Sequence, residues 1–203
     1  MKIIAGKIIA CLVAAIGLGS LNLGCNNEIP TLLNPTWVIP NLDWKMPGHT
    51  QWQISDKIAA PSDAVKGGTL LRLELQDQVP GSPKINIVYE PLRIKPTKLA
   101  NFSERQNSAF QQQLRRNQLK ATHEKRESIE LLGQPATKLE HSYSLGRGIS
   151  QVSVTSMSFL LVHADRGLSI TLEGRTELVS PWIEWFAQSV ENLETRLAAP
   201  SKG

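Results

Sequence analysis

Four consecutive segments between residues 127 and 172 alternate apolar with polar residues. Strict alternation predicts β-strands that each bury one face. Short turn signals join these segments, and such turns connect antiparallel neighbours. The pattern therefore predicts a run of four antiparallel strands. The strands are expected at 127–132, 136–145, 149–163 and 168–172, and the turns at 133–135, 146–148 and 165–167.

The preceding part of the chain predicts three more strands, at 52–59, 70–75 and 85–90. In the second of these, Leu71, Leu73 and Leu75 alternate with polar residues, which indicates one buried face. Glycine and proline clusters separate the three segments, as is typical of turns.

Two segments change to a helical period. Residues 102–119 place apolar side chains near helical spacing, and Asn101 with Glu104 forms a potential capping box at the start. Ser180-Pro181 predicts the start of a last helix, with serine as N-cap and proline at the first helical position. Its apolar stripe includes Trp182, Trp185 and Phe186, and should pack on the sheet. The element order predicts an α+β fold, an antiparallel β-sheet with helices packed on its faces.

Three features resemble a known superfamily. They are the strand that ends in Ile85-Asn86-Ile87-Val88, the helix 102–119 followed by Gly133-Gln134-Pro135-Ala136, and the hairpin 165–167 that leads to Pro181-Trp182-Ile183-Glu184-Trp185-Phe186. Over residues 50 to 196 the chain is similar to the Mog1/PsbP-like superfamily, and within it to exported DcrB-like and PsbP-like lipoproteins. The resemblance implies the same α+β architecture for a domain at 50–197. It also implies a non-catalytic binding or assembly factor, because the family has no shared catalytic residues.

Residues 1–24 have the pattern of a signal peptide, with Lys2 and Lys7, an apolar stretch and small residues at the end. The following Gly24-Cys25 resembles a bacterial lipobox, so Cys25 is the expected lipidation site, although Asn22 departs from the usual aliphatic residue. There are two alternatives: ordinary signal peptidase cleavage near Gly19 or Ser20, and an uncleaved N-terminal anchor. The predicted location is extracytoplasmic, with the domain held at a membrane by lipid.

Residues 25–49 are rich in proline and asparagine, which predicts an extended tether between the lipid and the domain. Trp37 and Trp44 are unusual in a spacer. If their rings are exposed, they are candidates for binding a partner. Residues 198–203 are expected to form a flexible tail.

Charge and motifs argue against several functions. Loss of Lys2 and Lys7 with the signal lowers the formal net charge from +4 to +2, too small to indicate a nucleic-acid partner. The four histidines, His49, His123, His141 and His163, do not have metal-ligand spacing. No serine lies in a Gly-x-Ser-x-Gly motif. The sequence thus predicts no cofactor, no metal and no enzyme.

The sequence favours a non-catalytic envelope lipoprotein that binds or helps to assemble another envelope component, with a membrane and a protein as partners. One alternative is a carrier of a small apolar ligand held between the sheet and the C-terminal helix. Another is an envelope hydrolase, which would require a deep polar pocket that contains His141, His163 or an Asp/Glu pair.

Overall fold

The structure is a computed structural model that describes residues 35–39, 42–55, 68–92, 98–119, 121–146, 151–163 and 166–195. All of them belong to one of the two units into which the chain divides, residues 34–203. The predicted signal, the lipidation site Cys25 and the tail lie outside the described residues. Within the described ranges, no helix combines the length and apolar character needed to cross a membrane.

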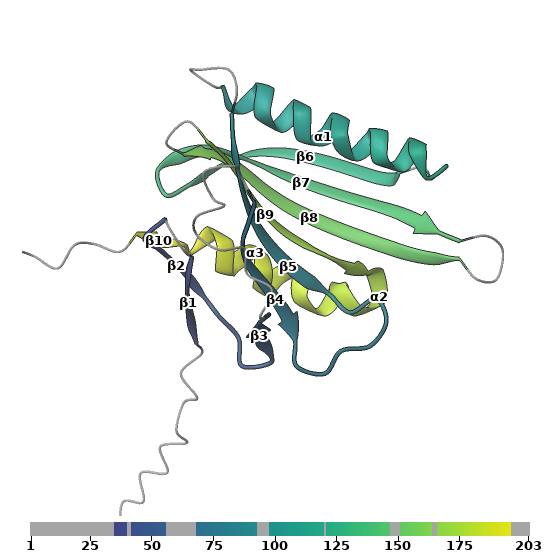
Figure 1. Ribbon diagram of the computed structural model, residues 1–203, viewed down its shortest axis with the longest axis horizontal. Coiled ribbons are helices and arrows are strands. Elements are labelled where there is room, and N and C mark those ends of the chain that lie inside the picture. Colours follow the sequence, from purple (N-terminus) through teal and green to yellow (C-terminus); the bar gives the residue numbers. More distant parts are fainter. Residues whose placement is uncertain are drawn as a thin grey trace, which may run out of the picture. The chain divides into compact units, whose positions relative to one another are not determined.

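A seven-stranded antiparallel sheet forms the centre of the fold (Figure 1). Its strands, in spatial order, are β3 (Trp52–Ile54), β4 (Gly68–Leu75), β5 (Lys84–Pro91), β9 (Arg166–Arg175), β8 (Val152–His163), β7 (Gln134–Leu145) and β6 (Ala121–Leu131). Strands β6, β7, β8 and β9 each pair with their neighbours in the sequence. The predicted run of four antiparallel strands is therefore confirmed.

Strand β6 begins at Ala121, six residues earlier than the alternation predicts. The basic residues Lys125 and Arg126 therefore belong to a strand. Pairing with β7 from Ala121 opposite Tyr143 stabilises it. The first part of this edge strand, residues 121–126, carries exposed charges and lacks the apolar alternation that marks the inner strands and the second part of β6.

Helix α1 (Leu99–Arg116) packs on one face of the sheet, over β7 and β8. It starts before Asn101, at the N-cap Lys98, and no side chain caps it. The predicted capping box is therefore wrong. Glu104 instead accepts a hydrogen bond from Arg126 on β6, because the tertiary partner is available to a side chain inside the helix.

The C-terminal helical segment consists of α2 (Thr176–Val179), the 3₁₀ turn η3 (Ser180–Trp182) and α3 (Ile183–Glu191). Ser180 is not an N-cap, because its hydroxyl donates to the carbonyl oxygen of Thr176 one turn earlier. The ring of Phe186 packs against Phe159 of β8, with 5.7 Å between centroids. Phe159 and its neighbour Leu160 point to opposite faces, so α3 and α1 cover opposite sides of the sheet.

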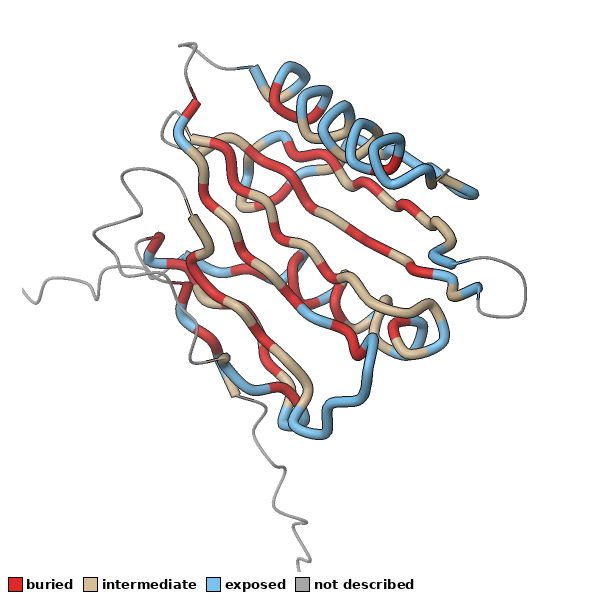
Figure 2. The backbone as a smooth tube through the Cα atoms, turned by 45° about the vertical axis from the view of Figure 1, so that its right-hand side comes forward, coloured by how far each residue is buried: buried red, intermediate tan, exposed pale blue. Residues whose placement is uncertain are grey.

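The two faces differ in composition. The face toward α3 holds the main hydrophobic core, in which Phe159, Ile170 and Phe186 are fully buried. The face toward α1 has only a small cluster of Leu92, Phe102, Leu139 and Leu160. Figure 2 shows the consequence, since α1 is exposed along much of its length while the strands beneath it are mostly buried. The α+β class with helices on both sheet faces is confirmed.

A second, three-stranded sheet corrects the predicted tether. It contains β1 (Thr36–Ile39), β2 (Trp44–Pro47) and β10 (Glu194–Thr195), in the order β1-β2-β10. The part of the predicted tether that starts at β1 is therefore a strand pair and not an extended spacer. The domain begins before residue 50. The sequence pattern misled because its prolines lie at or beyond the strand ends, where they cost no ladder hydrogen bond.

Candidate binding cleft beneath helix α1

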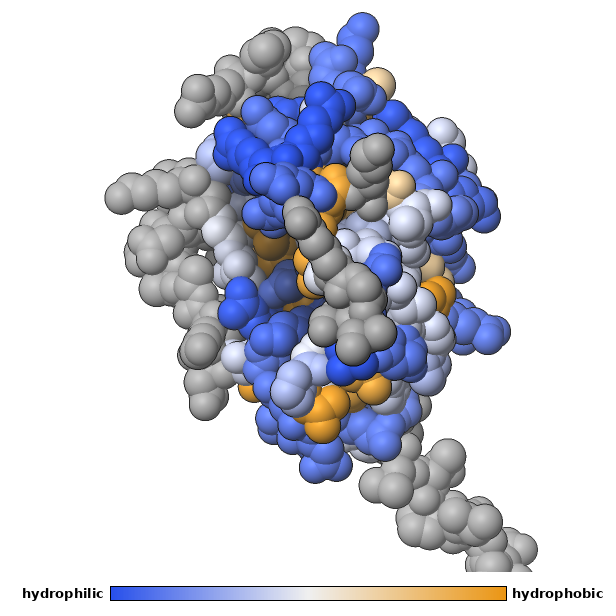
Figure 3. Space-filling view, turned by 90° about the vertical axis from the view of Figure 1, so that its right-hand side faces the viewer, coloured by the Kyte–Doolittle hydropathy of each residue, from blue (hydrophilic) through white to orange (hydrophobic). Residues whose placement is uncertain are grey.

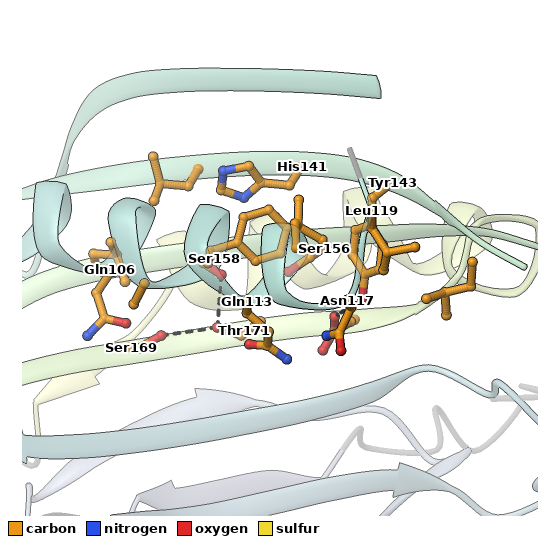
Figure 4. Close-up of a pocket in the computed structure, with 17 residues that line it drawn as sticks. Gln106, Gln113, Asn117, Leu119, His141, Tyr143, Ser156, Ser158, Ser169 and Thr171 are labelled. Carbon is orange, nitrogen blue, oxygen red and sulfur yellow. Dashed lines mark hydrogen bonds between the residues drawn. The ribbon is translucent and has the colours of Figure 1, made fainter. Parts of the chain in front are cut away.

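A cleft of about 360 Å³ lies between α1 and strands β7, β8 and β9. This volume falls in the range of small-molecule sites. Figure 4 shows side chains from the helix and from all three strands converging on it. On the face of the molecule drawn in Figure 3, hydrophilic residues dominate and apolar ones form small patches between them.

Four hydroxyl side chains form the floor of the cleft. Ser156 and Ser158 are two positions apart on β8, as are Ser169 and Thr171 on β9, so each pair points to the same face. The Thr171 Oγ1 atom lies 2.9 Å from Ser158 Oγ and 3.0 Å from Ser169 Oγ (Figure 4). The register explains the first contact, because Ser158 and Thr171 are opposite each other across the β8–β9 pair.

His141 on β7 is buried in the wall of the cleft, with 4% of its surface exposed. Its Nε2 atom lies 3.1 Å from Oδ1 of Asn107 on α1, an oxygen that can only accept, so Nε2 donates in this pair. The ring of Phe110 packs on the imidazole at 4.2 Å. Burial lowers the pKa of His141, the charge of Glu124 acts in the opposite direction, and His123 adds to the lowering. The imidazole is therefore neutral near pH 7.

A phenol and a carboxylate meet at the other end of the cleft. Tyr143 on β7 donates a hydrogen bond of 2.7 Å to Oε1 of Glu173 on β9, across the intervening β8. Burial, followed by the bond to Glu173 and its negative charge, raises the pKa of the Tyr143 phenol far above its ordinary value. Tyr143 thus stays a hydrogen-bond donor throughout the physiological range.

Amide side chains of α1 form the roof. Gln106, Gln113 and Asn117 lie seven and four residues apart, which places them on the same face of the helix. Polar contacts on both flanks fix the helix. Glu90 on β5 accepts from Gln106 and pairs with Arg105, and Glu124 on β6 accepts from Asn107 and Gln111.

The candidate partner-binding tryptophans lie elsewhere. Trp37 and Trp44 are 6% and 2% exposed and belong to the main core. Trp37 contacts Trp185 edge-on, and Trp44 contacts His163. Neither ring is exposed, as partner binding would require. Alternate side chains of β1 and β2 point into the core, and both tryptophans are among them.

The histidines are dispersed. His141 alone among the four lines the cleft, whereas His163 packs on Trp44, and His49 packs on Trp182 and Trp185. Among the described residues, no three His, Cys, Asp or Glu side chains are grouped as metal ligands would be.

The carrier hypothesis places an apolar ligand between the sheet and the C-terminal helix, where the main hydrophobic core lies. Phe159, Phe186 and Val190 are fully buried there. The described cleft lies on the opposite face, and its lining combines ten polar residues with Ala109, Phe110 and five leucines, so its position differs from the one that the carrier hypothesis gives.

The sequence analysis does not predict the cleft, because hydroxyl side chains at alternate positions of a strand are typical of a solvent-exposed face. A signal was present. Hydroxyl side chains recur at alternate positions of both β8 and β9, and these two strands are inner strands covered by a helix. Chemically, the lining offers neutral donors and acceptors, one carboxylate, two aromatic rings besides the imidazole, and the apolar side chains of five leucines and Ala109.

No known family model matches the sequence, and no curated protein matches it. The fold is a PsbP-like α+β fold, which confirms the architecture that the resemblance in the sequence implies. The solution structure of cyanobacterial PsbP (CyanoP) from Synechocystis sp. PCC 6803 matches with a TM-score of 0.58 and 10% identity, over 85% of this chain and 98% of that one.

Two further solved structures are similar at lower scores. One is PA94 of Pseudomonas aeruginosa, a protein of unknown function and putative regulator, with 15% identity, a TM-score of 0.44, and 81% of this chain and 99% of that chain covered. The other is LpqN of Mycobacterium tuberculosis, involved in cell envelope biogenesis, with 12% identity, a TM-score of 0.43, and 74% and 81% covered. At these identities the likeness concerns the fold.

Proposed function

We propose that this chain is a non-catalytic binding protein of the cell envelope, held at a membrane by lipid on Cys25, and that it binds another envelope component through the cleft beneath α1. The observation that carries the proposal is the cleft itself. It gathers hydrogen-bonding side chains from one helix and three strands around about 360 Å³. Such a convergence of polar groups in a concave site is typical of ligand recognition.

The contacts within the cleft favour binding over catalysis. A serine nucleophile requires a base within hydrogen-bond reach. The Nε2 atom of His141 is engaged by Asn107, and the carboxylate of Glu173 is engaged by Tyr143. The polar groups therefore support one another as a fixed surface, which suits recognition of a partner.

Site-specific photo-cross-linking in cells of the source organism tests the proposal. A photoreactive residue at Gln113, which is exposed and lines the cleft, should form a covalent adduct with a defined envelope component. The matched control is Gln112, which is equally exposed on the same helix but does not line the cleft. Adducts of the same yield from both positions, or from neither, would contradict binding through this site.

Cell fractionation of the Cys25→Ser variant tests the anchor. Two or more acyl chains give stable membrane attachment, because each buried CH₂ adds about 0.8 kcal/mol. We expect the variant to leave the membrane fraction and to retain its fold. Mass spectrometry of the membrane-derived N-terminus should show an acylated residue 25, and an unmodified terminus near Ser20 would contradict lipidation.

A further inference from the structure

The charge of the residues that line the cleft disfavours anionic ligands. None of the described residues that line it is lysine or arginine, and Glu173 contributes a negative charge. Among the described ion pairs, none involves Glu173, whose Oε1 atom accepts from the neutral Tyr143. Lys84, which lies opposite Glu173 across the β5–β9 pair, forms an ion pair with Glu74 at 3.4 Å. An anionic ligand would therefore meet no cation among the lining residues and would be repelled by the Glu173 carboxylate.

The floor has hydrogen-bonding capacity that the protein does not use fully. A hydroxyl group carries one donor and two acceptor sites. The bonds among Ser158, Ser169 and Thr171 use part of this capacity, and Ser156 adds a fourth hydroxyl. Because a hydroxyl rotates to donate or to accept, such a row adapts to a ligand that itself carries several hydroxyl groups.

The walls and roof match the remaining surfaces of such a ligand. The rings of Phe110 and Tyr143, 5.7 Å apart at an angle of 66°, provide apolar surface for carbon-bound hydrogens. Gln113 on α1 and Asn117, the C-cap residue of that helix, are exposed amides at the edge of the cleft, with both donors and acceptors. The carboxylate of Glu173 retains acceptor sites beyond the one that Tyr143 uses.

We infer that the cleft binds a neutral polyhydroxylated group, a sugar or polyol moiety, through the hydroxyl row of β8 and β9. This inference rests on the proposed function and specifies the chemical class that its site recognises. The expected geometry places ligand hydroxyls on Ser158 and Thr171, and the apolar face of the ligand on Phe110.

The test uses the full chain in a detergent whose headgroup carries no sugar. Glucose, N-acetylglucosamine and myo-inositol are titrated separately into the protein, with sodium phosphate and N-methylacetamide as anion and amide probes. Proton NMR of the aromatic side chains follows binding. At least one polyol should shift the signals of Phe110 and His141 but not those of Phe186, which is fully buried in the main core on the opposite face of the sheet.

Two threonines provide matched variants. Thr171→Val removes the hydroxyl that contacts Ser158 and Ser169, and should weaken polyol binding about five- to tenfold, the equivalent of one net hydrogen bond. Thr155→Val is the control, because Thr155 also contacts two hydroxyl groups, those of Ser142 and Thr176, but does not line the cleft. Its affinity should be unchanged. Ser158→Ala serves as the second variant if Thr171→Val does not fold.

Several outcomes would overturn the inference. These are the absence of any shift with all three polyols, a preference for phosphate or the amide probe, and equal weakening by the cleft and control variants. Cross-linking from Gln113 with no polyol binding would reject the ligand class and retain the proposed site. Polyol binding without cross-linking would support the inference and count against the envelope partner.

Discussion

Neighbouring aromatic residues on α3 are buried to different depths. Phe186 is fully buried against Phe159, whereas Trp185 is partly exposed and stacks on Trp52 with 5.7 Å between ring centroids. The apolar stripe predicted from the sequence therefore packs on the core. Its residues differ in depth, because Phe186 belongs to the core and Trp185 packs against the outside of it.

Alanine substitutions should reproduce this difference. Phe186→Ala should lower the free energy of unfolding by about 3–5 kcal/mol, as for other buried aromatics. Trp185→Ala should cost about half as much, because part of its ring stays in water. Urea denaturation at constant m-value measures both changes. A Trp185→Ala variant as stable as the original chain would show that this ring contributes no packing and would leave it as a docking surface.

The buried imidazole of His141 should make stability depend on pH. Burial lowers its pKa in the folded state below the ordinary value of 6.5, so the unfolded chain binds more protons at that site in the window below 6.5. The contribution of His141 is complete above pH 6.5 and is lost as the pH falls from there toward the folded pKa. The His141→Gln variant, compared with the original chain across pH 5 to 7 by urea denaturation, should show a weaker loss on the acid side. An identical pH profile for the two chains would contradict this.

The sequence predicts the burial of some strand residues and not the surroundings of others, because alternation carries only part of the information. Alternation identifies which face a strand residue occupies, so the burial of Phe159 and Ile170 could be predicted. It does not reveal what covers that face. The hydroxyls of Ser158 and Thr171 look like solvent-exposed residues until α1 is placed over them, and that placement depends on contacts such as Phe102 with Leu160, far apart in sequence.

At the scale of elements, the position of α1 depends on a small contact between its first turns and β9. A Cβ atom added at Gly167 would overlap the ring of Phe102, which is fully buried. The absence of a side chain at 167 therefore allows the helix to approach the sheet closely at this end. The other end of the helix, around Asn117, roofs the cleft.

Gly167→Ala should consequently destabilise the protein by about 1–3 kcal/mol, the usual cost of overpacking a core. In the background of Phe102→Leu, which shortens the opposing side chain, the same substitution should cost less. Thermal unfolding of the four chains of this double-mutant cycle measures the coupling. Strictly additive effects would show that residue 167 does not set the distance of α1 from the sheet.

The elements that could be predicted are those whose signal is local. The four strands β6 to β9 have alternation and turn residues within a short stretch, and both helices have an apolar stripe. The missed elements depend on distant partners. Strands β1 and β2 are only four residues long and are bordered by prolines, and their burial requires packing of Trp37 on Trp185 near the other end of the domain.

At the scale of the whole molecule, the first hairpin belongs to the folded domain. Trp37, Ile39, Trp44 and Met46 from β1 and β2 are buried in the main core. Each side chain of this size contributes roughly 1.5–3 kcal/mol when buried. Together they approach the net stability of about 5–15 kcal/mol that is typical of a domain.

Truncation tests this boundary. A chain that starts at Pro35 should unfold cooperatively, whereas one that starts at Thr50, the boundary expected from the sequence, should lose most or all of its stability. Circular dichroism during heating compares the two. Equal melting temperatures would show that the β1–β2 hairpin does not contribute to the stability of the domain.

The three-stranded sheet joins segments from opposite ends of the domain. Trp44 on β2 pairs with Thr195 on β10, about 150 residues later in the sequence. Closing a loop of that length carries an entropic cost that the earlier, local hairpins do not meet. During synthesis, the second edge of β2 has no partner until residue 195 has been made. Among the described strand pairings, this one is thus the last to become possible. If the chain is threaded through a membrane N-terminus first, the three-stranded sheet can close only after residue 195 has reached the far side.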